Sequence, residues 1–146
     1  KKNILQLIQS ELKAPKGQRN NFGNYNYRSA EDILEAVKPL LKKHNCALVI
    51  NDDIVEVADR VYVKATAMLA IANTPFASAT AFARETLVKK GMDEAQITGS
   101  ASSYARKYAL NGLLAIDDTK DADFTNKHGK DSPATKKVAT NNNDLI

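Results

Sequence analysis

Hydrophobic residues recur at helical spacing in three segments of the chain, residues 3–12, 29–44 and 94–115. Steps of three and four positions place such residues on one face of an amphipathic helix. In the first segment this face comprises Ile4, Leu5, Ile8 and Leu12, and in the second Ile33, Leu34, Val37, Leu40 and Leu41. The pattern therefore predicts three helices, each with one buried side.

The predicted second and third helices begin with residue pairs typical of helix N-terminal caps. Ser29 stands three positions before Asp32, and Asp93 stands three positions before Gln96. In such a pair the first side chain accepts a hydrogen bond from a backbone N–H in the first turn, and the second side chain can return one. Asn45 tolerates a positive φ and suits the left-handed position that ends the second helix.

Between the second and third helical segments the hydrophobic period falls to two, which is typical of strands. The alternation predicts strands near residues 46–58, 60–72 and 75–85, with turns at 58–59 and 73–75. Connections this short favour antiparallel pairing, so we expect a three-stranded meander.

The two faces of this predicted sheet differ in polarity. In the middle strand one face is apolar and comprises Val61, Val63, Ala65, Ala67, Leu69 and Ile71, whereas Tyr62, Lys64, Thr66 and Met68 form the other. In the third strand four alanines alternate with Phe76, Ser78, Thr80, Phe82 and Arg84. Since successive side chains point to opposite faces, Lys64 and Arg84 are predicted to point out of the half-polar face.

The order of elements indicates an α+β fold, with helices packed on one face of a small curved antiparallel sheet. Residues 1–124 are long enough to form one domain with its own core. Residues 125–146 contain mostly Lys, Asn, Thr and Ser, which predicts a flexible, disordered tail. Residues 16–28 are rich in Asn and Gly and are predicted to be a polar loop.

Charge is distributed unevenly over the 146 residues, whose net charge is +4. Residues 1–28 carry six Lys or Arg against one Glu, whereas residues 29–58 carry three against six Asp or Glu. A basic N-terminal region is compatible with a polyanionic partner. Cys46 is the one cysteine, so an internal disulfide is impossible and a reducing compartment is expected. No apolar run approaches the ~20 residues of a membrane span.

The sequence lacks the motifs of several enzyme classes. It contains no phosphate-binding loop of the G-x-x-x-x-G-K-[ST] type, no C-x-x-C pair and no H-E-x-x-H zinc motif. His44 and His128 lie in polar contexts and are not predicted to be catalytic, and Cys46 begins an apolar strand where a buried thiol is expected. We therefore predict that the chain is not an enzyme and uses no cofactor.

Four aspartates cluster after the last predicted helix, namely Asp117, Asp118, Asp121 and Asp123. They could bind a hard cation such as magnesium, or they could form a solvated acidic helix end. A metal-dependent nuclease would also need acids from other parts of the fold and a general base. The acidic helix end is therefore the preferred interpretation, and any effect of magnesium stays open.

The segment before these aspartates combines aromatic and basic residues. Tyr104, Arg106, Lys107 and Tyr108 fall within five positions. One side of the predicted helix comprises Ile97, Ala101, Tyr104, Ala105, Tyr108 and Gly112, and Gly99 is expected to allow a close backbone approach. Either the tyrosines pack in the core and the cations are solvated, or Arg106 and Lys107 project together beside the tyrosines and contact a ligand.

Residues 99–123 resemble the signature of the Essential Recombination Function (ERF) family, whose members are phage single-strand annealing proteins. The matching positions are Gly99, Ser100, Ser103, Tyr104, Arg106, Lys107, Tyr108, Leu110, Leu113, Leu114, Ile116 and the acids from Asp117 to Asp123. Residues 21–41 also resemble this family. Lys107 departs from the family, which often has arginine there, and Thr119 and Lys120 interrupt the acidic run.

The resemblance implies a β-β-β-α core similar to that of eukaryotic strand-annealing mediators, assembled into rings or arcs. It implies ATP-independent binding and annealing of single-stranded DNA during phage or prophage recombination in the cytoplasm of a bacterial host. A host or phage single-strand-binding protein is a candidate further partner, and no membrane is expected. The DNA would lie in a basic groove.

Nine residues are candidates for that groove. The first choices are Arg28, Arg106 and Lys107, followed by Arg84 and Lys64, with Lys16 and Arg19 on a flexible arm and Tyr25 and Tyr27 available for base stacking. Tyr25 and Tyr27 could instead pack against the edge of the sheet.

Three other functions remain as alternatives. A passive coating protein would bind single strands without annealing them, a nuclease would use the Asp117–Asp123 cluster with magnesium, and a structural phage protein would assemble without nucleic acid. The same sequence features are compatible with each of these functions. Only assays of pairing, cleavage and salt-sensitive binding therefore separate them.

Overall fold

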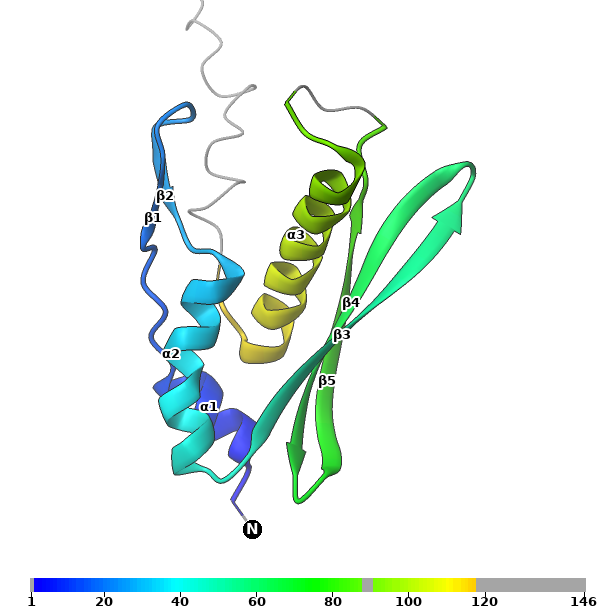
Figure 1. Cartoon of the computed structure of the whole chain (residues 1–146). Helices are drawn as coiled ribbons and strands as arrows, with labels where there is room; N and C mark the ends of the chain where they lie inside the picture. The colour runs from blue at the N-terminus through cyan, green and yellow to red at the C-terminus, as the bar shows by residue number, and fades with distance from the viewer. Residues whose placement is uncertain (1, 88–90, 118–146) are drawn as a thin grey trace, which may run out of the picture.

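The structure, a computed structural model, describes residues 2–87 and 91–117 of the chain (Figure 1). Three helices and five strands are found in this part, in the order α1 (Ile4–Glu11), β1 (Gln18–Asn20), β2 (Tyr25–Tyr27), α2 (Ala30–Lys43), β3 (Ala47–Val57), β4 (Arg60–Ile71), β5 (Thr74–Arg84) and α3 (Glu94–Leu114). The predicted α+β class and all three helices are confirmed. The predicted domain boundary at residue 124 and the tail at 125–146 lie outside the described residues.

Strands β3, β4 and β5 form the predicted antiparallel meander, with β4 in the centre. Ala58 and Asp59 have φ values of 48° and 61° and make the first tight turn, as predicted. Ala72 and Asn73, with φ values of 49° and 66°, make the second. This turn falls earlier than the predicted 73–75, because Thr74 already pairs with Ile71 and leaves Ala72 and Asn73 as the two central residues of a type I′ turn. The following proline is tolerated in β5 because β5 is an edge strand.

The predicted polar loop at residues 16–28 is wrong on both sides of its middle, because β1 and β2 pair there in a second, two-stranded sheet around a turn at residues 21–24. Gln18 pairs with Tyr27 and Asn20 pairs with Tyr25. The strands are only three residues long, which is too short for an alternation such as Tyr-Asn-Tyr to be distinguished from a loop. Side chains support the pairing, since Arg19 Nη1 donates to Asn26 Oδ1 at 3.1 Å.

The predicted helix caps are confirmed. Asp32 N–H donates to Ser29 Oγ at 3.2 Å, and Ser29 N–H donates to Asp32 Oδ2 at 2.9 Å. Asp93 and Gln96 exchange the equivalent pair of hydrogen bonds, both at 2.9 Å. Asn45 has a φ of 53° and ends α2 in the left-handed conformation, which residues with short polar side chains tolerate best after glycine.

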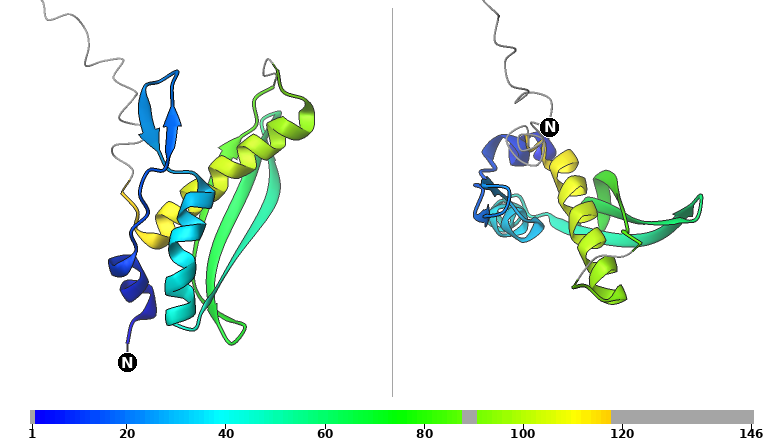
Figure 2. Two further views of the ribbon diagram at one scale, coloured as in Figure 1. Left: turned by 60° about the vertical axis from the view of Figure 1, so that its left-hand side comes forward. Right: turned by 90° about the horizontal axis from the view of Figure 1, so that it is seen from above.

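The helices all lie on one face of the larger sheet (Figure 2). Helix α3 packs on β4 and β5, and α1 and α2 pack on α3 from the side away from these strands. Gly112 of α3 allows a close approach to the sheet, because a Cβ at this position would lie 3.6 Å from Ala79 Cβ. Gly99, predicted to have that role, has no described atom within 4 Å of such a Cβ.

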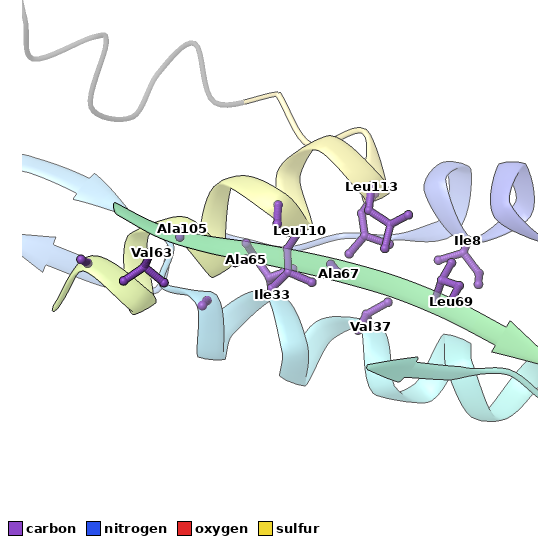
Figure 3. Packing of buried hydrophobic residues seen from close by; sticks show 14 residues of the cluster. Ile8, Ile33, Val37, Val63, Ala65, Ala67, Leu69, Ala105, Leu110 and Leu113 are labelled. Atoms are coloured by element: carbon purple, nitrogen blue, oxygen red, sulfur yellow. The ribbon is translucent and has the colours of Figure 1, made fainter. Parts of the chain in front are cut away.

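The hydrophobic core fills the space between the sheet and the three helices (Figure 3). The predicted apolar face of β4 is confirmed, because Val63, Ala65, Ala67 and Leu69 are at most 1% exposed. The helices contribute their largest fully buried side chains, namely Ile8, Ile33, Val37, Leu110 and Leu114. Each such side chain stabilises the fold by roughly 1.5–3 kcal/mol. None of the helices within residues 2–87 and 91–117 is long and apolar enough to span a membrane.

Candidate nucleic-acid interface

Helix α3 directs Arg106 and Lys107 to different sides, so the predicted joint projection of the two cations is wrong. Consecutive residues on a helix are about 100° apart. The Arg106 side chain turns to β3, where its Nε lies 3.1 Å from Asp52 Oδ1. Lys107 turns to the small β1–β2 sheet and is only 6% exposed, with its Nζ 5.6 Å from the centre of the Tyr27 ring.

The Arg106–Asp52 pair links α3 to β3 across the edge of the core. Ser102 Oγ also donates to Asp52 Oδ2. Burial alone would raise the pKa of Asp52, but the hydrogen bonds from Arg106 and Ser102 outweigh burial and hold this pKa below its usual value. Arg106 is thus already neutralised by a carboxylate and contributes less positive charge to a ligand surface than the sequence indicated.

A pocket of about 260 Å³ opens between the β1–β2 sheet, the start of α2 and the middle of α3. Its walls combine aromatic rings with polar groups, and they comprise Asn20, Tyr25, Tyr27, Arg28, Ser29, Ala30, Glu31, Ser103, Tyr104 and Lys107. The volume is slightly below the roughly 300–1,000 Å³ of pockets that hold drug-sized ligands. It is therefore suited to a small ligand or to one unit of a longer polymer.

The β1–β2 turn fixes the two tyrosines of this pocket. The Tyr25 and Tyr27 rings have centroids 6.0 Å apart at an interplanar angle of 54°. Asn20 Nδ2 donates to the Tyr25 hydroxyl at 3.1 Å, and Asn20 Oδ1 accepts from Gly23 N–H at 2.9 Å. The Tyr25 ring covers Gly23 so closely that a Cβ there would lie 2.7 Å from Tyr25 Cδ1. Glycine at this position therefore allows the ring to pack over the turn.

Tyr104 and Tyr108 are on the surface of α3, and the interpretation that they are core residues is wrong. They are 53% and 42% exposed, respectively. The side of α3 that meets the sheet comprises the small residues Ala101, Ala105 and Ala109, because alanines allow the helix to pack closely on the alanines of β5. Tyr104 is left at the rim of the pocket, opposite the tyrosines of the β1–β2 sheet.

Arg28 borders the pocket but also has a structural role. Its Nε donates to the Ala14 carbonyl oxygen at 2.9 Å, and its Nη1 reaches the Asp117 carbonyl oxygen at 3.5 Å. These bonds join the segment after α1 to the end of α3. Arg28 therefore helps to hold the wall of the pocket in place, in addition to any contact with a ligand.

The remaining candidate cations lie elsewhere. Lys64 is opposite Phe82 and Arg84 is opposite Tyr62, on the face of the sheet away from α3. This register confirms the predicted orientation of both side chains. Because Lys64 points away from α3, the sheet and α3 lie between Lys64 and Lys107. Arg84, at the end of its strand, also borders a smaller hollow that reaches Tyr104.

Lys16 and Arg19 do not form the predicted flexible arm. Arg19 lies in β1, where its guanidinium donates to the side chains of Asn24 and Asn26. The Lys16 Nζ atom is buried. Of the nine predicted residues, the structure thus brings four together at the pocket, Tyr25, Tyr27, Arg28 and Lys107.

The pocket joins the two segments, residues 21–41 and 99–123, whose sequences resemble one family. The sequence model of the ERF superfamily matches residues 2–145. The chain belongs to the ERF superfamily. It is 60% identical over 121 residues to the Essential recombination function protein of Salmonella phage P22. No solved structure matches the chain.

This ERF-superfamily chain spans 57% of the length of its phage P22 relative, and 83% of the chain is aligned. The predicted family is confirmed by both comparisons. The expected similarity to eukaryotic annealing mediators stays a prediction, although the consecutive elements β3, β4, β5 and α3 have the expected β-β-β-α order.

Sequence reasoning missed several polar groups of the pocket, including Asn20, Glu31 and Ser103. Ser103 could have been predicted, because it is a position of the family signature. No motif or hydrophobic period indicated Asn20 or Glu31. Within the described ranges no group of three or more His, Cys, Asp or Glu side chains could hold a metal ion. Of the aspartate cluster only Asp117 is described, and Asp118, Asp121 and Asp123 lie outside the described residues.

Proposed function

We propose that this chain binds single-stranded DNA and anneals complementary strands without nucleotide hydrolysis, as an oligomer, in phage recombination. The observation that carries the proposal is the pocket lined by Tyr25, Tyr27, Tyr104 and Lys107, in which the Lys107 ammonium faces the Tyr27 ring. Membership of the ERF superfamily and similarity to a phage protein named for recombination support the same proposal.

The composition of the pocket suits a nucleotide of a single strand. Each unpaired base has two aromatic faces, and stacking of one base on a tyrosine contributes roughly 1–3 kcal/mol. The Lys107 ammonium supplies positive charge for a phosphate, and Asn20 and Ser103 supply hydrogen-bonding groups that do not depend on base identity. Binding would therefore be largely independent of sequence, as annealing of arbitrary complementary strands requires.

Annealing needs no external energy source. Each stacked base-pair step is worth about 1.4 kcal/mol, so ten steps release roughly 14 kcal/mol. The main obstacles are repulsion between phosphates and the search for the correct register. A protein that neutralises phosphates and holds a strand extended lowers both obstacles, and this requires neither ATP nor a catalytic residue.

The cations at the pocket set the expected salt dependence. Lys107 and Arg28 border it, whereas Arg106 is paired with Asp52 and Lys64 lies on the opposite face. Two neutralised phosphates give a slope of log affinity against log salt of about −1.4 per subunit, which lowers the affinity about sevenfold between 50 and 200 mM salt. A cooperative oligomer would show a steeper dependence for the whole assembly.

The proposal is tested by mixing two complementary labelled oligonucleotides with the protein, without ATP, in magnesium and in chelator. Faster pairing than the spontaneous rate in both buffers is the expected result. Binding that retards pairing would identify a coating protein instead. Shortening of the labelled strands in magnesium alone would identify a nuclease, and absence of salt-sensitive binding would identify a structural protein.

The wider setting follows from the same proposal. The chain would act in the cytoplasm of the infected bacterium, where recombining phage DNA exposes single strands. It would need no cofactor, and the annealing rates in magnesium and in chelator show whether magnesium modulates it. A single-strand-binding protein of host or phage is the proposed partner that delivers coated strands.

A further inference from the structure

Two exposed surfaces on opposite sides of α3 carry complementary features. One is the turn that joins β1 and β2, and the other is the end of the β3–β4 hairpin, which extends beyond the layer of helices (Figures 1 and 2). We call them the turn surface, defined by Arg19 and Phe22, and the arm surface, defined by Ile54, Glu56 and Asp59. Helix α3 lies between them, so one copy of the chain cannot bring its own two surfaces together.

The turn surface presents an exposed aromatic ring and, three positions earlier in the chain, a cation held in place by hydrogen bonds. The Phe22 side chain is fully exposed to solvent. Arg19 is held by the neutral side chains of Asn24 and Asn26, and it forms no ion pair with any described residue. Arginine and aromatic residues, including phenylalanine, are enriched in protein–protein interfaces.

The arm surface presents the opposite charge beside an aliphatic side chain. Ile54 continues the face of β3 that packs on the core at Leu48 and Ile50, but here no helix covers it and it is 60% exposed. Glu56 and Asp59 are exposed and form no ion pair within the described ranges. The arm surface therefore has an uncovered apolar side chain with two uncompensated carboxylates.

We propose that the turn surface of one copy binds the arm surface of the next copy, with Phe22 packed on Ile54 and Arg19 facing Glu56 and Asp59. The occupant is a second copy because the charges are complementary and the two surfaces face away from each other in one copy. Contacts between different surfaces of identical subunits are head-to-tail and generate a closed ring or an open filament.

This proposal rests on the oligomeric form included in the proposed function, and it adds the surfaces that would build that form. It also accounts for the position of the DNA-binding pocket. Every subunit of a head-to-tail assembly has the same surroundings, so the pocket between the β1–β2 sheet and α3 would recur at regular intervals along the ring or filament. A single strand could then pass from subunit to subunit.

Charge reversal provides the test, with sedimentation velocity of the 146-residue chain at low salt as the measurement. The Arg19→Glu variant has two acidic surfaces, and the Glu56→Lys/Asp59→Lys variant has two basic ones. Each alone should need at least about a hundredfold higher concentration to assemble, because like charges meet at every contact. An equimolar mixture should assemble again as an alternating oligomer, which unfolded chains could not do.

Matched controls keep the test specific. Lys38→Glu makes the same charge change as Arg19→Glu at an exposed site of α2 and should assemble like wild type. Val57 is 55% exposed on the other face of the same arm, so Val57→Ser should retain assembly whereas Ile54→Ser should weaken it at least about tenfold.

Three results would overturn this inference: wild type that is monomeric at all concentrations, charge-reversal variants that sediment like wild type, or a mixture that does not assemble. A monomeric wild type that still anneals DNA would refute these surfaces and the oligomeric form, but not the proposed annealing activity. An assembled wild type that fails to anneal DNA would refute only the proposed function.

Discussion

Removal of the Tyr27 ring should weaken binding of single-stranded DNA without changing its salt dependence. The ring contacts the Lys107 ammonium, whose Nζ lies 5.6 Å from the ring centre, and in the proposed function it also stacks on a base. Loss of stacking costs roughly 1–3 kcal/mol, which corresponds to about a 5- to 150-fold lower affinity. Tyr27→Phe keeps both contacts and should bind within about twofold of wild type.

Fluorescence anisotropy with a labelled oligonucleotide, at several salt concentrations, measures both quantities. Tyr27→Ala should shift the affinity at every salt concentration by the same factor, because the number of neutralised phosphates is unchanged. Tyr62→Ala is the matched control, since Tyr62 lies on the face of the sheet away from α3. Wild-type affinity of Tyr27→Ala, or equal losses for Tyr27→Ala and Tyr62→Ala, would refute stacking in the pocket.

Three further predictions concern stability, and denaturant unfolding measures each of them. The pKa of Asp52 is lowered in the folded chain, so its ion pair with Arg106 stabilises the fold at neutral pH and is lost as the pH falls below about 4. Asp52→Asn should cost about 1 kcal/mol at pH 7, and the difference from wild type should vanish in acid. Gly23→Ala should cost about 1 kcal/mol because the new Cβ displaces the Tyr25 ring. Ser29→Ala removes the cap of α2 and should cost about 1 kcal/mol, whereas an unchanged unfolding midpoint would contradict the capping role.

The sequence predicted the fold well where a long hydrophobic period was accompanied by a local signal, such as a helix cap. The capping pairs at Ser29 and Asp93 set the starts of α2 and α3, and Asn45 set the end of α2. The alternation through β4 identified the buried face because one side of a central strand must be apolar. Such signals depend only on neighbours in the chain, so they can be recognised without the tertiary structure.

The β1–β2 sheet could not be predicted in the same way. Its three-residue strands are stabilised by side-chain bonds, such as those of Asn20 with Gly23 and Tyr25, and these bonds have no periodic signature. The hydrophobic pattern could not predict the orientation of Arg106 and Lys107 either. It depends on Asp52 and Tyr27, which are distant in sequence from both cations and reach them only through the packing of α3.

The charge pattern located the positive residues but could not locate their partners. Arg28, Arg106 and Lys64 were all candidates for one groove, yet only Arg28 borders the pocket beside Lys107, whereas Arg106 pairs with Asp52 and Lys64 lies behind the sheet. All of these cations contribute equally to the net charge. A ligand, however, contacts only the cations that lie on the same surface. The structure therefore replaces a broad basic groove with a compact aromatic pocket around Lys107.

The most direct test of the central claim is the annealing rate of Lys107→Met compared with Lys38→Met, without ATP. Methionine has a length similar to lysine and fits a site that is only 6% exposed, while it removes the charge that faces the pocket. Loss of one charged contact with the strand predicts that Lys107→Met anneals about tenfold or more slowly, whereas Lys38→Met, changed on an exposed face of α2, anneals like wild type. A folded Lys107→Met variant that anneals at the wild-type rate would contradict the claim that this pocket holds the DNA strand.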